Sequence, residues 1–276
     1  MTDDTARLPF EERRTEDVPG HWLLARIGKR VLRPGGAELT RAMLDQAGLG
    51  GADVVELAPG LGWTAAEILA AGPQSYTGVD QDADAARIVA RAVAGRGRCL
   101  QGDAAATGLP AGSADVVVGE AMLTMQSDRG KQAIITEAVR LLRPGGRYAI
   151  HELGLRSVPT EPGSATAARQ ELARSIKVNA RPLPITEWQG LLEEAGLVVD
   201  WVGTAPMSLL SLRRNLADEG VRGTARILRN VLRDREVRSR VLAMRATFRR
   251  QRDSLVGVAF VAHLPVSPVE AQEDPR

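Results

Sequence analysis

Apolar residues in the middle of the chain follow two alternating patterns, short continuous runs and longer runs of helical period. Short valine-rich runs bounded by glycine, proline or charged residues are typical of strands buried on both faces, and apolar positions three and four apart are typical of amphipathic helices. Their alternation predicts an α/β fold, a doubly wound parallel sheet with helices on both faces. The predicted strands are 53–57, 75–79, 98–101, 115–119 and 147–153, and the predicted helices are 62–71, 82–94 and 128–142. Residues 104–114 carry too little helical pattern for an element to be predicted.

The segments that flank this core have their own patterns. Residues 1–19 are charged and contain two prolines, so we expect a poorly ordered arm. Two helices are predicted between Gly20 and Leu49, separated by the turn at 33–36. These helices could cover a site at the end of the sheet or pack on the sheet edge. After the core, the predicted order is helix 164–178, helix 186–196 with Thr186 as its cap, strand 197–203 and strand 254–264.

Residues 204–253 form a predicted helical insertion between the last two strands. Its apolar residues recur at helical spacing in two series, Val221, Ala225, Leu228 and Leu232, then Val237, Val241, Met244 and Phe248. The insertion contains 13 arginines and 5 acidic residues, an excess of +8. A solvated arginine face is the favoured interpretation; an anionic substrate, a nucleic-acid surface and a dimer interface are the alternatives. The predicted units are therefore an arm with lid helices (1–50), a core (51–203), the insertion (204–253) and a last strand with tail (254–276).

The stretch from Val54 to Ala70 has the order strand, glycine turn, helix. Pro59, Gly60 and Gly62 interrupt the apolar run before the helix begins. A turn of this kind presents backbone N–H groups and a helix N-terminus to a ligand, because glycine has no side chain to hold the ligand away. By itself the pattern also fits an ordinary strand-to-helix turn.

The spacing to the next acidic residue favours a nucleotide-type ligand. Asp80 ends the following apolar run, 18 positions after Gly62, close to the offset at which nucleotide-binding folds present a carboxylate to ribose hydroxyls. Three further segments follow in order: the Gly102-Asp103 pair, the run from Asp115 to Glu120, and LLRPGGRYAIHE. In this order and spacing, residues 53–153 resemble the class I S-adenosylmethionine-dependent methyltransferases.

The resemblance implies a Rossmann-like sheet of seven strands whose last strand is antiparallel, with S-adenosylmethionine as cofactor. It implies that Glu56, Ala58, Gly60 and Gly62 surround the methionine part of the cofactor. Ala58 stands where the family has its first loop glycine. The remaining implied cofactor contacts are Asp80 with the ribose, Gln81 beside the adenine, Asp103 and Ala104 at the adenine amino group, and Glu120 near the sulfonium and the substrate.

The acceptor side is less constrained by sequence. His151 and Glu152 end the fifth predicted strand, at the edge where open α/β sheets bind ligands, and either could act as a base. Strand alternation allows only one of the pair to point easily into the cleft. Glu120, near the sulfonium and the substrate, is the third catalytic candidate. His21 and Trp22 could form a lid, and Met122 and Met125 could line an apolar pocket or fill the core.

Composition narrows the function classes. The chain has one cysteine, three dispersed histidines and no apolar run long enough to span a membrane, so we expect no metal site, no membrane partner and a cytoplasmic location. The net charge is only +2 and nine residues are aromatic, which disfavours a nucleic-acid partner.

These observations leave several hypotheses. The first is methyl transfer to O, N or S of a small, partly apolar metabolite. The second is a nucleic-acid or protein methyltransferase that uses the arginine-rich insertion, and the third is a non-catalytic cofactor-binding protein in which the insertion forms a homodimer. A nicotinamide-dependent oxidoreductase gives no role to the GDA and GEAM segments.

Overall fold

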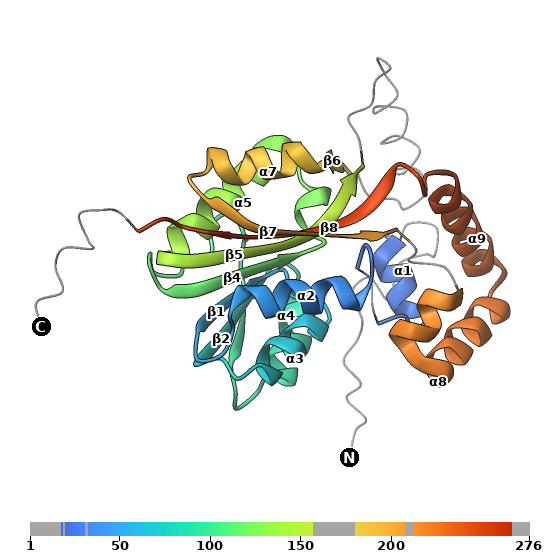
Figure 1. Ribbon diagram of the computed structural model, residues 1–276. Helices are drawn as coiled ribbons and strands as arrows, with labels where there is room; N and C mark the ends of the chain where they lie inside the picture. Colours follow the sequence, from blue (N-terminus) through green and yellow to red (C-terminus); the bar gives the residue numbers. More distant parts are fainter. Residues whose placement is uncertain (1–17, 19, 31–32, 157–179, 208–211, 267–276) are drawn as a thin grey trace, which may run out of the picture.

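The computed structural model describes residues 18, 20–30, 33–156, 180–207 and 212–266 of the chain (Figure 1). The predicted helix 164–178 and most of the N-terminal arm lie outside these residues. The helices are α1 (Gly20–Arg26), α2 (Ala37–Ala47), α3 (Trp63–Ala70), α4 (Ala83–Ala92), η2 (Leu123–Met125), α5 (Asp128–Leu141), α7 (Ile185–Glu194), α8 (Leu212–Arg233) and α9 (Arg235–Arg250). The strands are β1 (Asp53–Leu57), β2 (Ser75–Asp80), β3 (Arg98–Gln101), β4 (Ala114–Glu120), β5 (Leu142–Leu155), β6 (Leu183–Pro184), β7 (Val198–Pro206) and β8 (Leu255–His263).

The strands form one sheet in the order β3-β2-β1-β4-β5-β8-β7. Strands β1 to β5 are parallel, and β8 is antiparallel to both β5 and β7. The predicted seven-stranded sheet with an antiparallel last strand is thereby confirmed. The two-residue strand β6, which pairs with the end of β5, is an addition that the pattern did not predict because it is too short to have a period.

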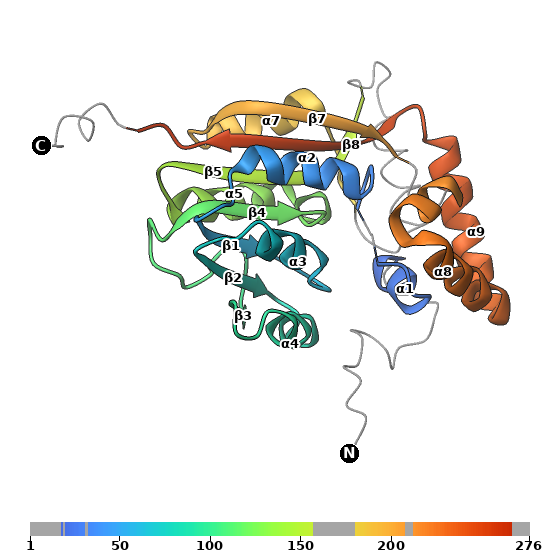
Figure 2. The same ribbon diagram turned by 60° about the horizontal axis from the view of Figure 1, so that its bottom comes forward.

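Helices cover both faces of the sheet. Figures 1 and 2 show α5 and α7 on one face and α2, α3 and α4 on the other. Each face has its own apolar core, one around Trp188 and Phe260 and the other around Met43 and Ile68. Burial on both sides explains why β1 and β4 contain the consecutive valines 54–55 and 116–118 rather than an alternating pattern.

Local signals set the helix starts. Asp82, Ser127 and Asp234 occupy N-cap positions of α4, α5 and α9, and each side chain accepts hydrogen bonds from backbone N–H groups of the first turn. The prediction that Thr186 caps a helix is wrong: α7 begins one residue earlier, and its N-cap is Pro184. Pro184 makes no side-chain cap hydrogen bond.

The two N-terminal helices have different positions. Helix α2 packs against β5, β7 and β8, whereas α1 lies beyond the end of the strands with α8 and α9 (Figure 2). Residues of α1, α8, α9 and the ends of β5 and β8 share a separate apolar cluster. The insertion and α1 therefore form one helical unit at the carboxyl edge of the parallel strands.

Candidate active site

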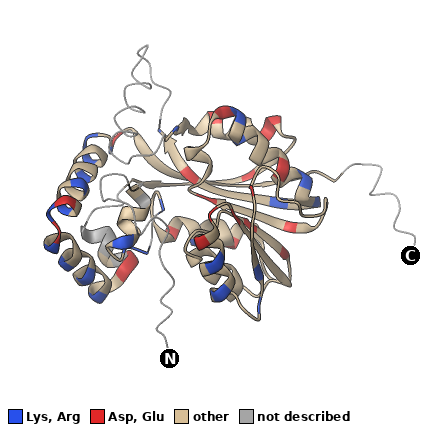
Figure 3. Ribbon diagram, turned by 180° about the vertical axis from the view of Figure 1, so that it is seen from behind, with Lys and Arg blue, Asp and Glu red and all other residues tan. Residues whose placement is uncertain are grey.

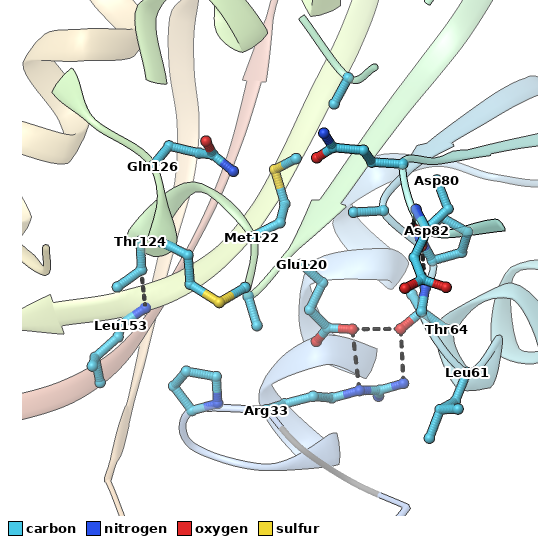
Figure 4. Close-up of a pocket in the computed structure, with 18 of the residues that line it drawn as sticks. Arg33, Leu61, Thr64, Asp80, Asp82, Glu120, Met122, Thr124, Gln126 and Leu153 are labelled. Atoms are coloured by element: carbon cyan, nitrogen blue, oxygen red, sulfur yellow. Dashed lines mark hydrogen bonds and ion pairs between the residues drawn. The ribbon is translucent and has the colours of Figure 1, made fainter. Parts of the chain in front are cut away.

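A cavity of about 1010 Å³ lies between the carboxyl ends of the parallel strands and the helical unit. One half is lined by residues at and after the ends of β1, β2 and β3, and the other by residues of η2, α1 and α9. Figure 4 shows Asp80 and Asp82 on one side of the cavity, and Thr124 and Gln126 on the other. This is the edge at which open α/β sheets bind ligands. Its volume is at the upper end for small-molecule sites, enough for a nucleoside cofactor and a small second ligand together.

The loop after β1 has a backbone curled around one end of the cavity. Ala58, Gly60 and Gly62 all have positive φ angles, of 53°, 59° and 76°, and Gly62 is the N-cap of α3. A Cβ on Gly60 would meet nothing within 4 Å, so the space beside it is open to a ligand. Ala121, which follows β4, repeats the left-handed backbone with φ 53°. Strained backbone of this kind is typical of ligand sites.

Asp80 lies at the end of β2 on the cavity wall, as the spacing predicts. Its Oδ2 accepts a hydrogen bond of 2.9 Å from the Gly60 N–H, and its Oδ1 accepts one of 3.0 Å from the Asp82 N–H. Burial raises the pKa of Asp80, and these two hydrogen bonds oppose the rise. The carboxylate is thus fixed beside the glycine loop, in position for a ligand hydroxyl pair.

Glu56 lies inside the same end of the cavity and is buried. The Tyr76 hydroxyl donates a 2.6 Å hydrogen bond to its Oε2. Burial raises the pKa of Glu56 to about 8, with the nearby charges of Glu120 and Asp80 adding to the rise. A buried carboxyl group of this kind suits a cationic ligand group, whose charge would favour its ionised form. The carboxylates of Glu56 and Asp80 are acceptors that fit the ammonium group and the ribose hydroxyls of S-adenosylmethionine.

Glu120, at the end of β4, is the centre of a buried polar cluster on the cavity wall. Arg33 Nε lies 3.1 Å from Glu120 Oε2, which also accepts a hydrogen bond from the Thr64 hydroxyl (Figure 4). Its other oxygen accepts from the Thr40 hydroxyl and lies 2.9 Å from His151 Nδ1. Both carboxylate oxygens therefore have two protein partners each.

The electrostatics of this cluster favour an ionised Glu120. Burial by itself raises the pKa of Glu120, but the charge of Arg33 and the contacts with His151 and Thr40 outweigh burial and hold the pKa at about 2. Arg33 is itself buried, and its remaining nitrogens donate to Thr64 at 2.8 Å and Glu67 at 3.2 Å. The cluster ties the N-terminal segment to β4 and to the first turns of α3.

Neither His151 nor Glu152 lines the cavity; both are fully buried. His151 Nε2 contacts the Pro34 carbonyl, and its Nδ1 faces Glu120 and Thr40. Glu152 points to the opposite side of the strand, where it accepts hydrogen bonds from the backbone N–H groups of 122–124 and from the Thr124 hydroxyl. Burial raises the pKa of Glu152, and these hydrogen bonds oppose the rise. Strand alternation allowed one of these two side chains to point into the cleft, but neither of them lines the cavity.

The second half of the cavity is largely apolar, and the polar side chains on its η2 wall are those of Thr124 and Gln126. It contains Trp22 of α1, whereas the side chain of His21 lies outside the described residues. Four of the six methionines of the chain line the cavity: Met122, Met125, Met207 and Met244. Phe248 joins them from α9.

Several lining residues were not among the sequence-based candidates. Arg33 reads as part of a turn, and only its long-range contacts identify it as a site residue. Met244 and Phe248 share the predicted helical face of the insertion, but periodicity does not say what that face covers. The predicted cofactor residues Gln81, Asp103 and Ala104 do line the cavity, whereas Gly62 lies next to its lining as the cap of α3. Within the described ranges, no group of three His, Cys, Asp or Glu side chains could hold a metal ion.

The fold and the cavity define a class of enzyme, and comparison with known proteins agrees. A family model described as a methyltransferase domain matches residues 54–146. A protein of Haemophilus influenzae, itself described only as uncharacterized, is 30% identical over 224 residues, covering 79% of this chain and 87% of that protein.

Solved structures show the same fold. Phosphoethanolamine N-methyltransferase 2 of Haemonchus contortus, in complex with S-adenosyl-L-methionine, has a TM-score of 0.66 at 17% identity, covering 89% of this chain and 57% of that one. A geranyl diphosphate methyltransferase, in complex with GPP and sinefungin, has a TM-score of 0.59 at 16% identity, covering 81% and 75%.

Residues 54–146 are a methyltransferase domain, and the chain has the fold of the class I S-adenosylmethionine-dependent methyltransferases. It is therefore an enzyme whose family uses S-adenosylmethionine as cofactor, and the resemblance drawn from residues 53–153 is confirmed. The nicotinamide alternative is set aside.

Proposed function

We propose that this methyltransferase acts on O, N or S of a small, largely apolar molecule. The observation that supports this is the apolar half of the cavity, with its four methionines, Trp22 and Phe248. Methionine is flexible and polarizable, so such a lining suits an apolar acceptor better than a charged one. Fold neighbours whose names specify small acceptors, phosphoethanolamine and geranyl diphosphate, agree with a small molecule.

The cofactor would occupy the polar half. We assign Asp80 to the ribose hydroxyls, because both of its oxygens are held at the cavity wall by backbone N–H groups. Glu56 would face the ammonium group, with the curled backbone at Ala58, Gly60 and Gly62 around the methionine part. Gln81, Asp103 and Ala104, which line the same half, would contact the adenine.

The chemistry requires alignment more than proton transfer. S-adenosylmethionine, held by Asp80, Glu56 and the loop after β1, would supply an electrophilic methyl group on a sulfonium for in-line transfer to the acceptor atom. The protein must orient the two partners and keep water away from them. The apolar lining from α1, η2 and α9 provides the water exclusion.

Glu120, His151 and Glu152 are better suited to positioning than to acting as bases. Each carboxylate oxygen of Glu120 has two protein partners, and the pKa of Glu120 is about 2. His151 lies behind Glu120, out of the cavity. Glu152 binds the backbone of the loop that carries Met122 and Met125, so it orients the acceptor wall.

A substitution that fills only the acceptor half tests the proposal. In Met125→Trp, we expect S-adenosylhomocysteine binding by calorimetry to remain and methyl transfer to a panel of apolar alcohols, amines and thiols to be lost. Met125→Leu, which conserves volume and polarity, should retain transfer. Transfer to bulk RNA or protein, with none to the small-molecule panel, would overturn the proposal.

A further inference from the structure

The second half of α8 exposes a row of apolar side chains. Gly220, with φ 69°, kinks the helix, and the turns that follow carry Val221, Leu228 and Leu232 at exposures of 75%, 49% and 66%. At 100° per residue these positions fall within about 60° of one another on the helix. The buried side of the same helix carries Ile227, which packs in the helical unit. The helix is therefore packed through its other side, and the exposed apolar row takes no part in that packing.

A row of arginines lies next to this apolar row. Arg222, Arg229 and Arg233 are seven and four positions apart, on the adjacent side of the helix, and all are exposed. Arg226 is different, because it donates a 3.1 Å hydrogen bond to the Gly28 carbonyl. Figure 3 shows basic residues along both α8 and α9, the helices of the insertion 204–253 whose excess of positive charge is +8.

Three kinds of partner could meet such a surface. In a symmetric dimer the same patch faces itself, so the arginine rows of two copies would approach one another and repel. A nucleic acid would pair with the arginines, but it offers nothing to the apolar row, and the insertion has a single aromatic residue for base stacking. An anionic bilayer offers both phosphates for the arginines and acyl chains for the apolar row.

We propose that α8 docks the enzyme onto the surface of anionic lipid bilayers, with Val221, Leu228 and Leu232 in the interface and the arginine row on the headgroup phosphates. The association is peripheral: none of the helices in the described part of the chain is long and apolar enough to cross a membrane. A bilayer is also where apolar acceptors concentrate, and α9 beside this surface lines the apolar half of the cavity. This last argument rests on the proposed function; the docking itself does not.

Vesicle flotation of the full-length protein tests the docking. We expect it to float with vesicles of phosphatidylcholine and phosphatidylglycerol, to stay behind with phosphatidylcholine alone, and to be released by high salt. The double variant Arg222→Gln, Arg229→Gln should bind about 30-fold more weakly, the value of two basic residues at about 1 kcal/mol each near an anionic leaflet. The double variant Val221→Ser, Leu232→Ser should lose flotation.

Matched controls come from surfaces away from α8. Arg96→Gln with Arg129→Gln removes the same charge, and Val198→Ser with Val202→Ser removes similarly exposed valines of β7; both should float like the wild type. The docking proposal would be overturned if all variants floated equally, or if the wild-type protein did not float with anionic vesicles. A dimer in light scattering that the α8 variants dissociate, or tight RNA binding lost in the arginine variant alone, would also overturn it. No acceptor or cofactor is needed, so failure here is distinct from failure of the proposed function.

Discussion

Single residues at two strand ends hold the site in a strained shape. Ala58 after β1 and Ala121 after β4 have left-handed backbones, a conformation that costs an alanine about 1 kcal/mol or more relative to glycine. Each is fixed by a 2.7 Å backbone hydrogen bond to the neighbouring strand, Ala58 to Val79 and Ala121 to His151. The parallel sheet therefore maintains the curvature of both loops around the cavity.

Glu120 should contribute acid-sensitive stability. Its folded pKa of about 2 lies below its ordinary value of 4.5, so the stabilisation is fully present above pH 4.5 and is lost as the pH falls towards 2. A difference of this size corresponds to about 3 kcal/mol. Glu120→Gln should therefore lower the free energy of unfolding at neutral pH by about this amount, because Arg33 keeps its buried charge with one counter-charge fewer.

Urea denaturation of wild type and Glu120→Gln across this range measures the effect. The gap between them should narrow as the pH falls below 4.5, since the wild-type carboxylate then becomes protonated. Glu194→Gln, at the exposed end of α7, should match the wild type throughout. If the difference in free energy of unfolding between the two proteins stayed constant with pH, Glu120 would stabilise the fold through packing and not through its charge.

At the scale of elements, α1 and α8 are joined by buried charges. Glu219 of α8 accepts hydrogen bonds from the Arg30 backbone N–H at 2.7 Å and from its Nε at 3.0 Å, and it lies 3.8 Å from Lys29 Nζ. Asn230 adds a hydrogen bond to the Ile27 carbonyl. Both Glu219 and Lys29 are buried, so the segment after α1 and the insertion depend on each other.

Glu219→Gln should loosen this helical unit and leave the sheet unchanged. Removing one partner of a buried ion pair costs about 3–5 kcal/mol, and the segments that lose the contact are 20–30 and 221–233. We expect faster amide hydrogen exchange there and unaltered exchange in β4 and β5. Asp253→Asn, whose partner Arg252 is exposed, is the control. Faster exchange across the whole sheet would contradict a local role.

At the scale of the whole molecule, the sequence predicts what depends on neighbours along the chain. Glu56 lies one residue before the end of β1 and Asp80 ends β2, and parallel strands bring such ends together, so the meeting of these two carboxylates at one end of the cavity was predictable. The contacts of Arg33 with Glu120 and of Arg30 with Glu219 join residues far apart in sequence, and no periodicity encodes them. Helical spacing predicted the series at Val221, but it could not say that this face would be exposed while that of Met244 lines the cavity.

Cofactor binding should link the whole fold to pH through Glu56. In the free folded protein the pKa of Glu56 is raised to about 8, above its ordinary value of 4.5. Between these two pH values the folded protein holds a proton on Glu56 that the unfolded chain has lost, so the free energy of unfolding decreases as the pH rises. A bound ammonium group favours the ionised form. Affinity for S-adenosylhomocysteine should therefore rise by up to about tenfold per pH unit between about pH 6 and pH 8.

Thermal unfolding with S-adenosylhomocysteine measures this linkage. A ligand at about 100 times its dissociation constant stabilises a protein by about 2.7 kcal/mol, so the rise in Tm at one fixed ligand concentration should be larger at pH 8 than at pH 6. Glu56→Gln should bind more weakly with a Tm rise independent of pH, and Asp80→Asn should show no rise, as should wild type with NAD. A pH-dependent rise that survives in Glu56→Gln would assign the linkage to another group.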